Sequence, residues 1–350
     1  MESRSMSSSA DRCPAAMIRP CSENCCAKSR IPPHWDEERK HWAMSEAGPY
    51  ASAKAVDDAI KQAAKNAAAA KPLVSVSDRI RQAYFDRFLC RVFSEGSASE
   101  WLLKGGTGML ARVPDSRATL DVDLYRSDLT LDLALVELRR LASIDLGDHF
   151  RFEYATHEMI SGGGKQPYTD GYRVSFEIYI GTSRKGRLSV DLVVSAGITG
   201  EIVVTQPANR LALPRLASAD YRLYPVVDQI ADKVCATVAD YSGKPSSREK
   251  DLVDLVILAL THDVDAHSLG CAVATEARRR GLTPLSALTI PTGWGARYAK
   301  EIGSTPYGRD FGDVGAAVGL MREFLDPVLD GRVTTGTWSH ASLRWEPVTA

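Results

Sequence analysis

Residues 119–124, with the sequence TLDVDL, constrain the fold of this chain more than any other segment. Polar and apolar residues alternate strictly along it, which is typical of a β-strand with one face in the core. Asp121 and Asp123 then point to the same side, about 7 Å apart by the rise of a strand. The apolar residues around them are expected to face the core: Leu120, Val122 and Leu124.

Two carboxylates on one strand face repel each other unless a cation lies between them, and Mg²⁺ prefers carboxylate oxygens while leaving positions open for phosphate. Asp191 lies in a second apolar run, residues 188–194, where a charged side chain needs a partner. If the two strands are neighbours, three carboxylates converge, as in two-metal phosphoryl transfer. A solvated strand face for Asp121 and Asp123, and a turn-capping role for Asp191, remain the alternatives.

A glycine segment precedes these acids. Gly105, Gly106 and Thr107 lie between a strand-like run and the start of a short helix. Glycines let the backbone approach a ligand closely, and free N–H groups at a helix start favour phosphate. The Thr107 hydroxyl is a further donor for a phosphate oxygen. The same three residues also occur in ordinary turns.

Charged residues recur in two downstream helical segments. Lys233 lies within residues 226–241, and Arg248, Asp251 and Asp254 gather at the start of the next helix. Asp251 and Asp254 are three residues apart and share a helix face. We expect Lys233 to contact a triphosphate and Asp251 to orient Lys233 or the nucleotide. Arg248 and Asp254 are expected to take part in nucleotide binding. The alternative for Asp251 is that it complements the helix dipole.

The order of these patterns predicts an α+β protein, with a mixed sheet flanked by helices and a helical C-terminal domain. We expect a disordered leader over residues 1–50, N-terminal helices and a catalytic domain over 51–220, and the helical domain over 221–350. The leader holds Cys13, Cys21, Cys25 and Cys26, but no CxxC pair supports a zinc site. Met44 is an alternative first residue.

Several further motifs have less specific explanations. Ser77 resembles the N-cap of a helix that ends near Gly96, and its arginines are expected on a solvated face or a polyanion-binding surface: Arg79, Arg87 and Arg91. Residues 161–165 (SGGGK) lack the first glycine of a phosphate loop and are expected to form a hairpin loop. Residues 262–267, which contain two His and two Asp, are expected to form a loop after a helix.

Composition excludes some classes of protein. The 43 Lys and Arg nearly balance the 44 Asp and Glu, which excludes a polybasic nucleic-acid binder. No run of about 18 apolar residues predicts a membrane span. Isolated cysteines such as Cys90 favour a reduced, cytoplasmic protein. Residues 271–300 nevertheless contain five basic residues and one acid, a local excess that suits a phosphate backbone or a solvated helix end.

Taken together, these motifs resemble the AbiEii/AbiGii-type toxin nucleotidyltransferases, including the mycobacterial MenT-type toxins, in the DNA polymerase β-like superfamily. The resemblance spans about residues 101–345. It rests on the GGT segment at 105–107, RATLDVD at 117–123, DQIADK at 228–233 and REKDLVDL at 248–255, and on FLDPVL at 324–329 with the two tryptophans that follow.

The resemblance implies metal-dependent transfer of a nucleoside monophosphate from an NTP, with release of pyrophosphate. Asp121 and Asp123 would be ligands of Mg²⁺ or Mn²⁺. Asp191 would be the third metal-binding carboxylate, as in other members of the superfamily. Gly106 and Thr107 would cradle the triphosphate, Lys233 would bind its phosphates, and Asp251 would be a further essential acid. Some relatives modify tRNA acceptor ends, block translation and are paired with an antitoxin.

Our leading hypothesis is therefore a toxin that transfers nucleotides to RNA, with tRNA as the expected acceptor. A small-molecule nucleotidyltransferase of the antibiotic-modifying kind would use the same acids with an acidic acceptor pocket. A nucleotide-binding regulator without catalysis is the third possibility, and the complete set of Asp121, Asp123, Lys233 and Asp251 argues against it.

Overall fold

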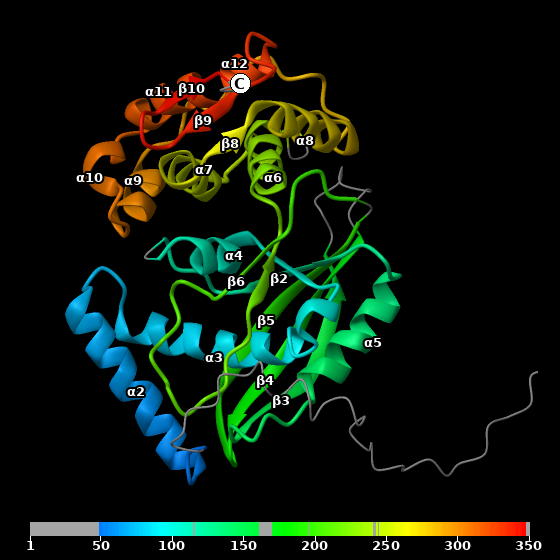
Figure 1. Ribbon diagram of the computed structural model, residues 1–350, viewed down its shortest axis with the longest axis vertical. Coiled ribbons are helices and arrows are strands. Elements are labelled where there is room, and N and C mark those ends of the chain that lie inside the picture. Colours follow the sequence, from blue (N-terminus) through cyan, green and yellow to red (C-terminus); the bar gives the residue numbers. More distant parts are fainter. Residues whose placement is uncertain are drawn as a thin grey trace, which may run out of the picture. The chain divides into compact units, whose positions relative to one another are not determined.

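The computed structural model describes residues 49–114, 116–160, 170–195, 197–240, 243 and 245–347, and Figure 1 shows the order of the elements. The first part of the chain contains α2 (Ala53–Ala70), α3 (Val76–Val92), η2 (Gly96–Ala98), β1 (Leu102–Lys104), α4 (Gly105–Arg112), β2 (Val122–Arg126), α5 (Leu131–Ala142), β3 (Phe150–Met159), β4 (Asp170–Ile180), β5 (Ser183–Val194), β6 (Val203–Thr205) and β7 (Tyr221–Leu223). The second part contains α6 (Val226–Val238), α7 (Glu249–Thr261), β8 (Val264–Asp265), α8 (Ala266–Arg279), α9 (Ala296–Gly303), α10 (Gly308–Phe311), α11 (Val314–Phe324), α12 (Asp326–Leu329), β9 (Thr337–Ser339) and β10 (Arg344–Glu346).

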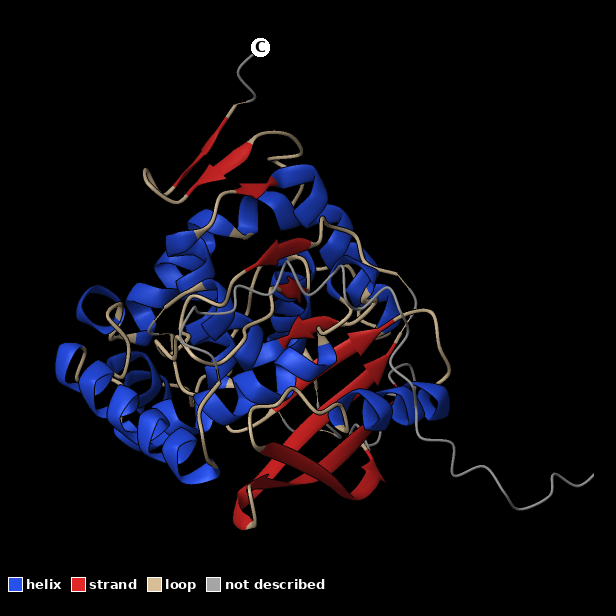
Figure 2. Ribbon diagram, turned by 60° about the horizontal axis from the view of Figure 1, so that its bottom comes forward, coloured by secondary structure: helices blue, strands red, loops and turns tan. Residues whose placement is uncertain are grey.

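The large sheet has seven strands in the order β3-β4-β5-β2-β1-β7-β6. Figure 2 shows strands in red with helices packed around them in blue. β2 runs parallel to β5 and antiparallel to β1, and β1 runs parallel to β7, so the sheet is mixed. A second sheet of three short strands, β10-β9-β8, lies among the C-terminal elements. These features confirm the predicted α+β class. None of the helices in the described part of the chain is both long and apolar enough to span a membrane.

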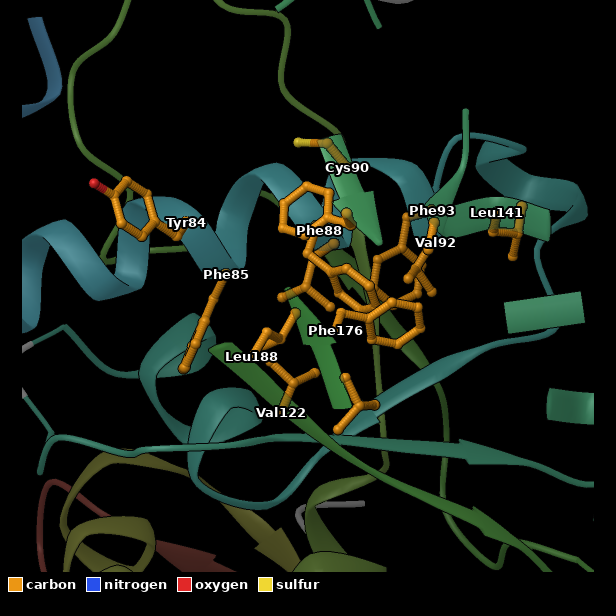
Figure 3. Close-up of a cluster of buried hydrophobic side chains, with 14 of the residues drawn as sticks. Tyr84, Phe85, Phe88, Cys90, Val92, Phe93, Val122, Leu141, Phe176 and Leu188 are labelled. Atoms are coloured by element: carbon orange, nitrogen blue, oxygen red, sulfur yellow. The ribbon is translucent and has the colours of Figure 1, made fainter. Parts of the chain in front are cut away.

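One hydrophobic core lies between the large sheet and the helices α3 and α5. Phe88 of α3 contacts Phe152 and Phe176 of the sheet, with ring centroids 5.3 and 5.2 Å apart. Figure 3 shows Phe88 and Phe176 together with Val122 of β2 and Leu188 of β5. The alternating apolar residues of β2 and β5 therefore pack into this core on one face of the sheet, and their polar residues lie on the other face.

The arginines of α3 contradict the expected solvated face. Arg87 and Arg91 are 1% and 0% exposed, and both donate to the Asp148 carboxylate at 2.7–3.1 Å. Arg79 is also buried. These three arginines are enclosed by the elements that pack on α3, and buried charges require internal partners. The helix begins at Val76 with Ser75 as its N-cap, not Ser77.

A second core joins the C-terminal helices. Trp338 is fully buried and contacts Phe324 at 4.8 Å between ring centroids. Its indole N–H donates to the carbonyl oxygen of Ala259 in α7 at 2.8 Å. Met109 and Val113, at and just after α4, contribute to the same core. Helix α4 therefore connects the large sheet to the helical elements, with its glycine-rich start on the sheet side.

Two hypotheses concern residues outside the described part of the chain. These are the cysteine-containing leader, within residues 1–48, and the hairpin loop at 161–165. The proposed division into a catalytic domain over 51–220 and a helical domain over 221–350 stays a prediction. The structure adds that β7, at Tyr221–Leu223, is a strand of the large sheet.

Candidate functional site

The candidate site begins with two neighbouring strands. β2 and β5 pair in parallel, and Asp123 lies opposite Asp191 in their register. On its other side, Asp123 lies opposite Lys104 of β1. Val122 and Leu124, on either side of Asp123, are fully buried in the core. The alternation expected from the sequence therefore holds for β2, and it turns Asp123 away from the core.

The Asp123 carboxyl group has an unusual electrostatic environment. Burial, together with the negative charges of Asp121 and Asp191, raises its pKa from 3.8 to about 7. The positive charges of Lys104 and Lys233 act in the opposite direction but do not cancel the effect. Within the described residues, no group donates a hydrogen bond to this carboxylate. Such a group binds a proton near neutral pH, or it binds a cation.

Asp191 has a different partner. Both of its carboxylate oxygens accept hydrogen bonds from the Arg173 guanidinium of β4, each at 2.8 Å. This fork geometry is the strong form of an Arg–carboxylate pair, although about half of the Arg173 side chain is exposed. The two strands expected to be neighbours are neighbours. Asp191 contributes its charge to the site while its oxygens are bound by Arg173.

Asp121 immediately precedes β2, and two threonines hold it. The Thr119 hydroxyl donates to its carboxylate at 2.8 Å, and the Thr107 hydroxyl donates to its carbonyl oxygen at 2.7 Å. Thr107 is thus engaged with the protein backbone and fixes the glycine segment against the aspartate segment. Leu120 was expected in the core, but it is 67% exposed. The strand begins only at Val122, so the alternation does not extend back to Leu120.

The glycine segment packs directly on these residues. Gly105 has φ = +60°, and a Cβ atom there would lie 1.9 Å from the Asp123 Oδ2 atom. A Cβ on Gly106 would lie 2.7 Å from the Thr119 hydroxyl oxygen. A side chain at Gly105 would therefore displace Asp123, and one at Gly106 would displace Thr119. The Gln229 amide of α6 donates to the carbonyl oxygen of Gly105 at 3.2 Å, so α6 also holds this turn.

A buried charge network lies next to this segment, between α6 and α7. Lys233 donates to Asp254 at 2.5 Å and to Asp251 at 3.2 Å. Asp254 is fully buried and also accepts two hydrogen bonds from Arg117, at 2.9 and 2.7 Å. Arg248 donates to the other oxygen of Asp251 at 2.5 Å. Each buried charge in the network therefore faces an opposite charge, as buried ions require.

These contacts determine the protonation of the network. Burial alone would lower the pKa of Lys233, but the carboxylates of Asp254 and Asp251 raise it above its ordinary value. Burial would raise the pKa of Asp251, but Lys233 and Arg248 hold it below its ordinary value. Lys233 is therefore a cation at neutral pH and Asp251 an anion. Arg248 differs from both, because its side chain is 54% exposed and can meet a ligand from solvent.

The structure thus brings the predicted residues into two clusters. Asp121, Asp123 and the glycine segment form the first cluster, and Lys233, Asp251, Asp254 and Arg248 form the second. Lys233 lies close enough to act electrostatically on Asp123. The positions of the predicted residues agree with a shared site, and their roles in catalysis and binding stay predictions.

Several residues that support these clusters were not predicted as site residues: Lys104, Arg117, Thr119, Arg173 and Gln229. Arg117 and Thr119 continue the every-second-residue spacing of Asp121 and Asp123, so the sequence held a signal for them. Lys104 directly precedes Gly105, and its ammonium group donates to Asp232 at 2.7 Å. Arg173 had no such signal, because only the register between β4 and β5 places it beside Asp191.

The donor set bears on whether a metal ion fits here. Among the described residues, no three His, Cys, Asp or Glu side chains converge closely enough to hold an ion together. Asp121 and Asp123 remain as a pair of hard oxygen donors, and burial together with the negative charges of Asp121 and Asp191 raises the pKa of Asp123. Mg²⁺ is typically bound by one or two carboxylates plus the phosphates of a substrate. The pair fits that kind of site.

The family described as "Nucleotidyl transferase AbiEii toxin, Type IV TA system" matches residues 87–314, which is more than half of the chain. The matched segment contains both clusters of the candidate site. This chain belongs to the AbiEii nucleotidyltransferase toxin family, as its motifs indicated.

Two solved structures align with most of the chain at low identity. JHP933 from Helicobacter pylori has 13% identity and a TM-score of 0.37, and the match covers 72% of this chain and 94% of that protein. The nucleotidyltransferase toxin MenT4 from Mycobacterium tuberculosis has 17% identity and a TM-score of 0.41, with 76% and 94% covered. Among curated proteins, none matches. The family assignment rests on the family match.

Proposed function

We propose that this protein transfers a nucleoside monophosphate from an NTP to RNA, at the acceptor end of tRNA, and that pyrophosphate is released. The observation that carries the proposal is the placement of Asp121 and Asp123 against the turn at Gly105 and Gly106. The acids would form a cation-binding edge, and the absence of side chains at the two glycines lets this edge pack directly against the start of α4. Membership of a nucleotidyl transferase family supports the same chemistry.

Asp121 and Asp123 would hold Mg²⁺ or Mn²⁺, and the bound ion would neutralise charge on the triphosphate. Asp191 would add negative charge to this edge while Arg173 keeps it in place. The backbone N–H groups at the start of α4 would donate to phosphate oxygens, because the free N–H groups of a helix start favour phosphate. Thr107 fixes this turn by its bond to the Asp121 carbonyl.

Lys233 would contribute positive charge toward the phosphates, and Asp251 would orient it. The 3.2 Å contact between the two side chains supports this assignment. Arg248, bound to Asp251 and half exposed, is the cation of the second cluster that a triphosphate in solvent would meet first. Asp254 would act by positioning Lys233, because it is fully buried and bound by both Lys233 and Arg117.

RNA as acceptor is supported by the toxin family and by exposed basic residues in the segment 271–300. Arg278, Arg297 and Lys300 are exposed there, as a surface for a phosphate backbone requires. By contrast, Arg280 is engaged by Glu276 and Asp232, at 2.6 and 3.3 Å. In this proposal the protein acts in the cytoplasm, where it would block translation until a cognate antitoxin restrains it.

The test is to incubate the purified protein with each α-labelled NTP, Mg²⁺ and total tRNA. A second incubation replaces the tRNA with a panel of aminoglycoside-type small molecules. We expect label on tRNA with at least one NTP, and none with the Asp121→Asn protein. Label only on a small molecule would replace the RNA proposal with antibiotic-type modification. Tight NTP binding without any transfer would indicate a nucleotide-binding regulator.

A further inference from the structure

Lys104 lies beside the first cluster of the candidate site, although no motif pointed to it. It is the last residue of β1, directly precedes Gly105 and lies opposite Asp123 in the antiparallel pair of β1 with β2. Directly opposite residues of such a pair project to the same face of the sheet. The charge of Lys104 is close enough to lower the pKa of Asp123, against burial and two neighbouring carboxylates. Lys104 therefore shares the face and the electrostatic environment of the candidate metal-binding acids.

The ammonium group of Lys104 is held but not enclosed. It donates to the Asp232 carboxylate of α6 at 2.7 Å and lies 4.9 Å from the centre of the Tyr224 ring. An ammonium group has three donors, and among the described residues Asp232 accepts from one of them. The Lys104 side chain is 19% exposed. A ligand in the site can therefore reach this cation, and the cation has donors left for it.

Lys233, the other lysine near Asp123, is less available. Its side chain is 7% exposed, and it donates to two carboxylates, those of Asp254 and Asp251, at 2.5 and 3.2 Å. A phosphate would compete with both of them for Lys233, and buried ion pairs are costly to break. The structure thus favours a charge effect for Lys233 over a direct contact with a ligand.

Asp232 does not depend on Lys104 alone. It also accepts from Arg280, just beyond the end of α8, at 3.3 Å. If the ammonium group of Lys104 turned partly toward a phosphate, the carboxylate of Asp232 would still face a cation. A shared ion pair of this kind can orient a lysine and still leave it free to bind an anion.

We propose that Lys104 binds the triphosphate of the NTP directly, at the start of α4 and beside Asp121 and Asp123. This inference rests on the proposed function, because it adds a substrate-binding residue to the same site. Lys104 directly precedes the first turn of α4, whose free N–H groups favour phosphate. A phosphate on that turn would lie next to Lys104 and accept from its ammonium group. Asp232 would position the ammonium group.

Calorimetric binding of inorganic triphosphate with Mg²⁺ tests the contact. This probe has no nucleoside to transfer, so its binding is independent of the base and of the acceptor. The full-length variants are Lys104→Gln, which removes the charge, and Lys104→Arg, which keeps it. Lys185→Gln on β5 is the matched control, because the Lys185 side chain is also 19% exposed and faces one aspartate, Asp57, at 3.1 Å. Thermal melting verifies folding, and Lys104→Met replaces Lys104→Gln if that protein unfolds.

We expect Lys104→Gln to weaken triphosphate binding about tenfold, as the loss of a charge-assisted hydrogen bond implies. Lys104→Arg should lose less, and Lys185→Gln should bind like the wild type. The proposal is overturned if the wild type does not bind the probe or if Lys104→Gln binds it like the wild type. It is also overturned if Lys185→Gln loses as much as Lys104→Gln, or if the two Lys104 variants lose equally.

The tRNA-labelling assay on the same proteins separates this contact from the proposed function. We expect Lys104→Gln to raise the KM for the NTP about tenfold and to change kcat less, because the contact already forms in the bound substrate. Labelling of tRNA by Lys104→Gln with the KM of the wild type would contradict the contact and leave RNA transfer standing. Triphosphate binding that depends on Lys104, in a protein that labels no tRNA, would contradict RNA transfer and support the contact.

Discussion

Asp123 on β2 lies opposite Asp191 on β5 in a parallel strand pair, and the two carboxylates differ in their hydrogen-bond partners. The Asp191 oxygens are both bound by Arg173, whereas the Asp123 carboxylate receives no hydrogen bond from the described residues and has a pKa raised to about 7. Within one sheet, one acid is neutralised and its neighbour is left to attract a cation. Because of this difference, we expect a cation to bind beside Asp123 and not beside Asp191.

The raised pKa of Asp123 predicts a pH-dependent loss of stability. In the unfolded chain this carboxyl releases its proton near pH 3.8, and in the folded protein near pH 7. The folded state therefore holds more protons in that interval, so its contribution to stability falls as the pH rises from about 4 to about 7. Asp123→Asn cannot titrate and should not show this loss.

Urea unfolding of the wild type and Asp123→Asn at several pH values, without divalent cations, measures the effect. We expect the variant to become the more stable protein as the pH rises through 7, and the difference to shrink toward pH 4. A difference between the two proteins that does not change with pH would show that the Asp123 environment is not as described.

Gly105 provides a test of the close approach to Asp123. Gly105→Ala introduces a Cβ atom that would lie 1.9 Å from the Asp123 carboxylate, and it also disfavours φ = +60°. Gly96→Ala has nearly the same backbone strain, with φ = +57°, but no atom within 4 Å of the new Cβ. Gly96→Ala should therefore cost about 1–2 kcal/mol of stability and keep activity.

Gly105→Ala should lose more stability than Gly96→Ala and lose nucleotide transfer by at least about a hundredfold, since small misplacements at a reacting site are costly. Chemical unfolding and the label-transfer assay give the two values. Equal behaviour of the two variants would mean that only backbone strain matters at Gly105.

Asp254 is predicted to stabilise the protein through its two cationic partners. Asp254→Ala would leave Lys233 and Arg117 buried without this carboxylate, and breaking such a pair typically destabilises a protein by about 3–5 kcal/mol. The control is Asp310→Ala on α10, an exposed position where about 0.5 kcal/mol or less is expected. Urea midpoints compare them, and similar midpoints for both variants would contradict the described network.

Parts of the site followed from the sequence because strand periodicity acts locally. The spacing of Asp121 and Asp123 was predictable in this way, and so was the position of the GGT segment after a strand and at the start of a helix, where it forms the first turn of α4. The first residue of the strand was not predictable. The prediction that Leu120 faces the core was wrong because the strand begins two residues later. The sequence pattern contained no marker for that boundary.

The other differences depend on contacts between distant segments. Arg87 and Arg91 were expected in solvent because they lie off the apolar stripe of α3, but Asp148, about 60 positions away, receives them. Arg173 became part of the site through the register of β4 with β5. The pairing of Arg117 with Asp254 likewise joins the aspartate segment to α7. A local sequence pattern does not indicate which charged residues from distant segments will pair.

The central claim is that Asp121 and Asp123 carry nucleotidyl transfer. Its most direct test measures pyrophosphate release and tRNA labelling from α-labelled NTPs, with Mg²⁺ or with EDTA. The proteins are the wild type, Asp121→Asn, Asp123→Asn and the control Asp128→Asn, an exposed residue that pairs with Arg126. We predict that the wild type and Asp128→Asn are active only with the cation. The transfer rates of Asp121→Asn and Asp123→Asn should fall by at least about a hundredfold. Transfer that persists in both aspartate variants would contradict the account.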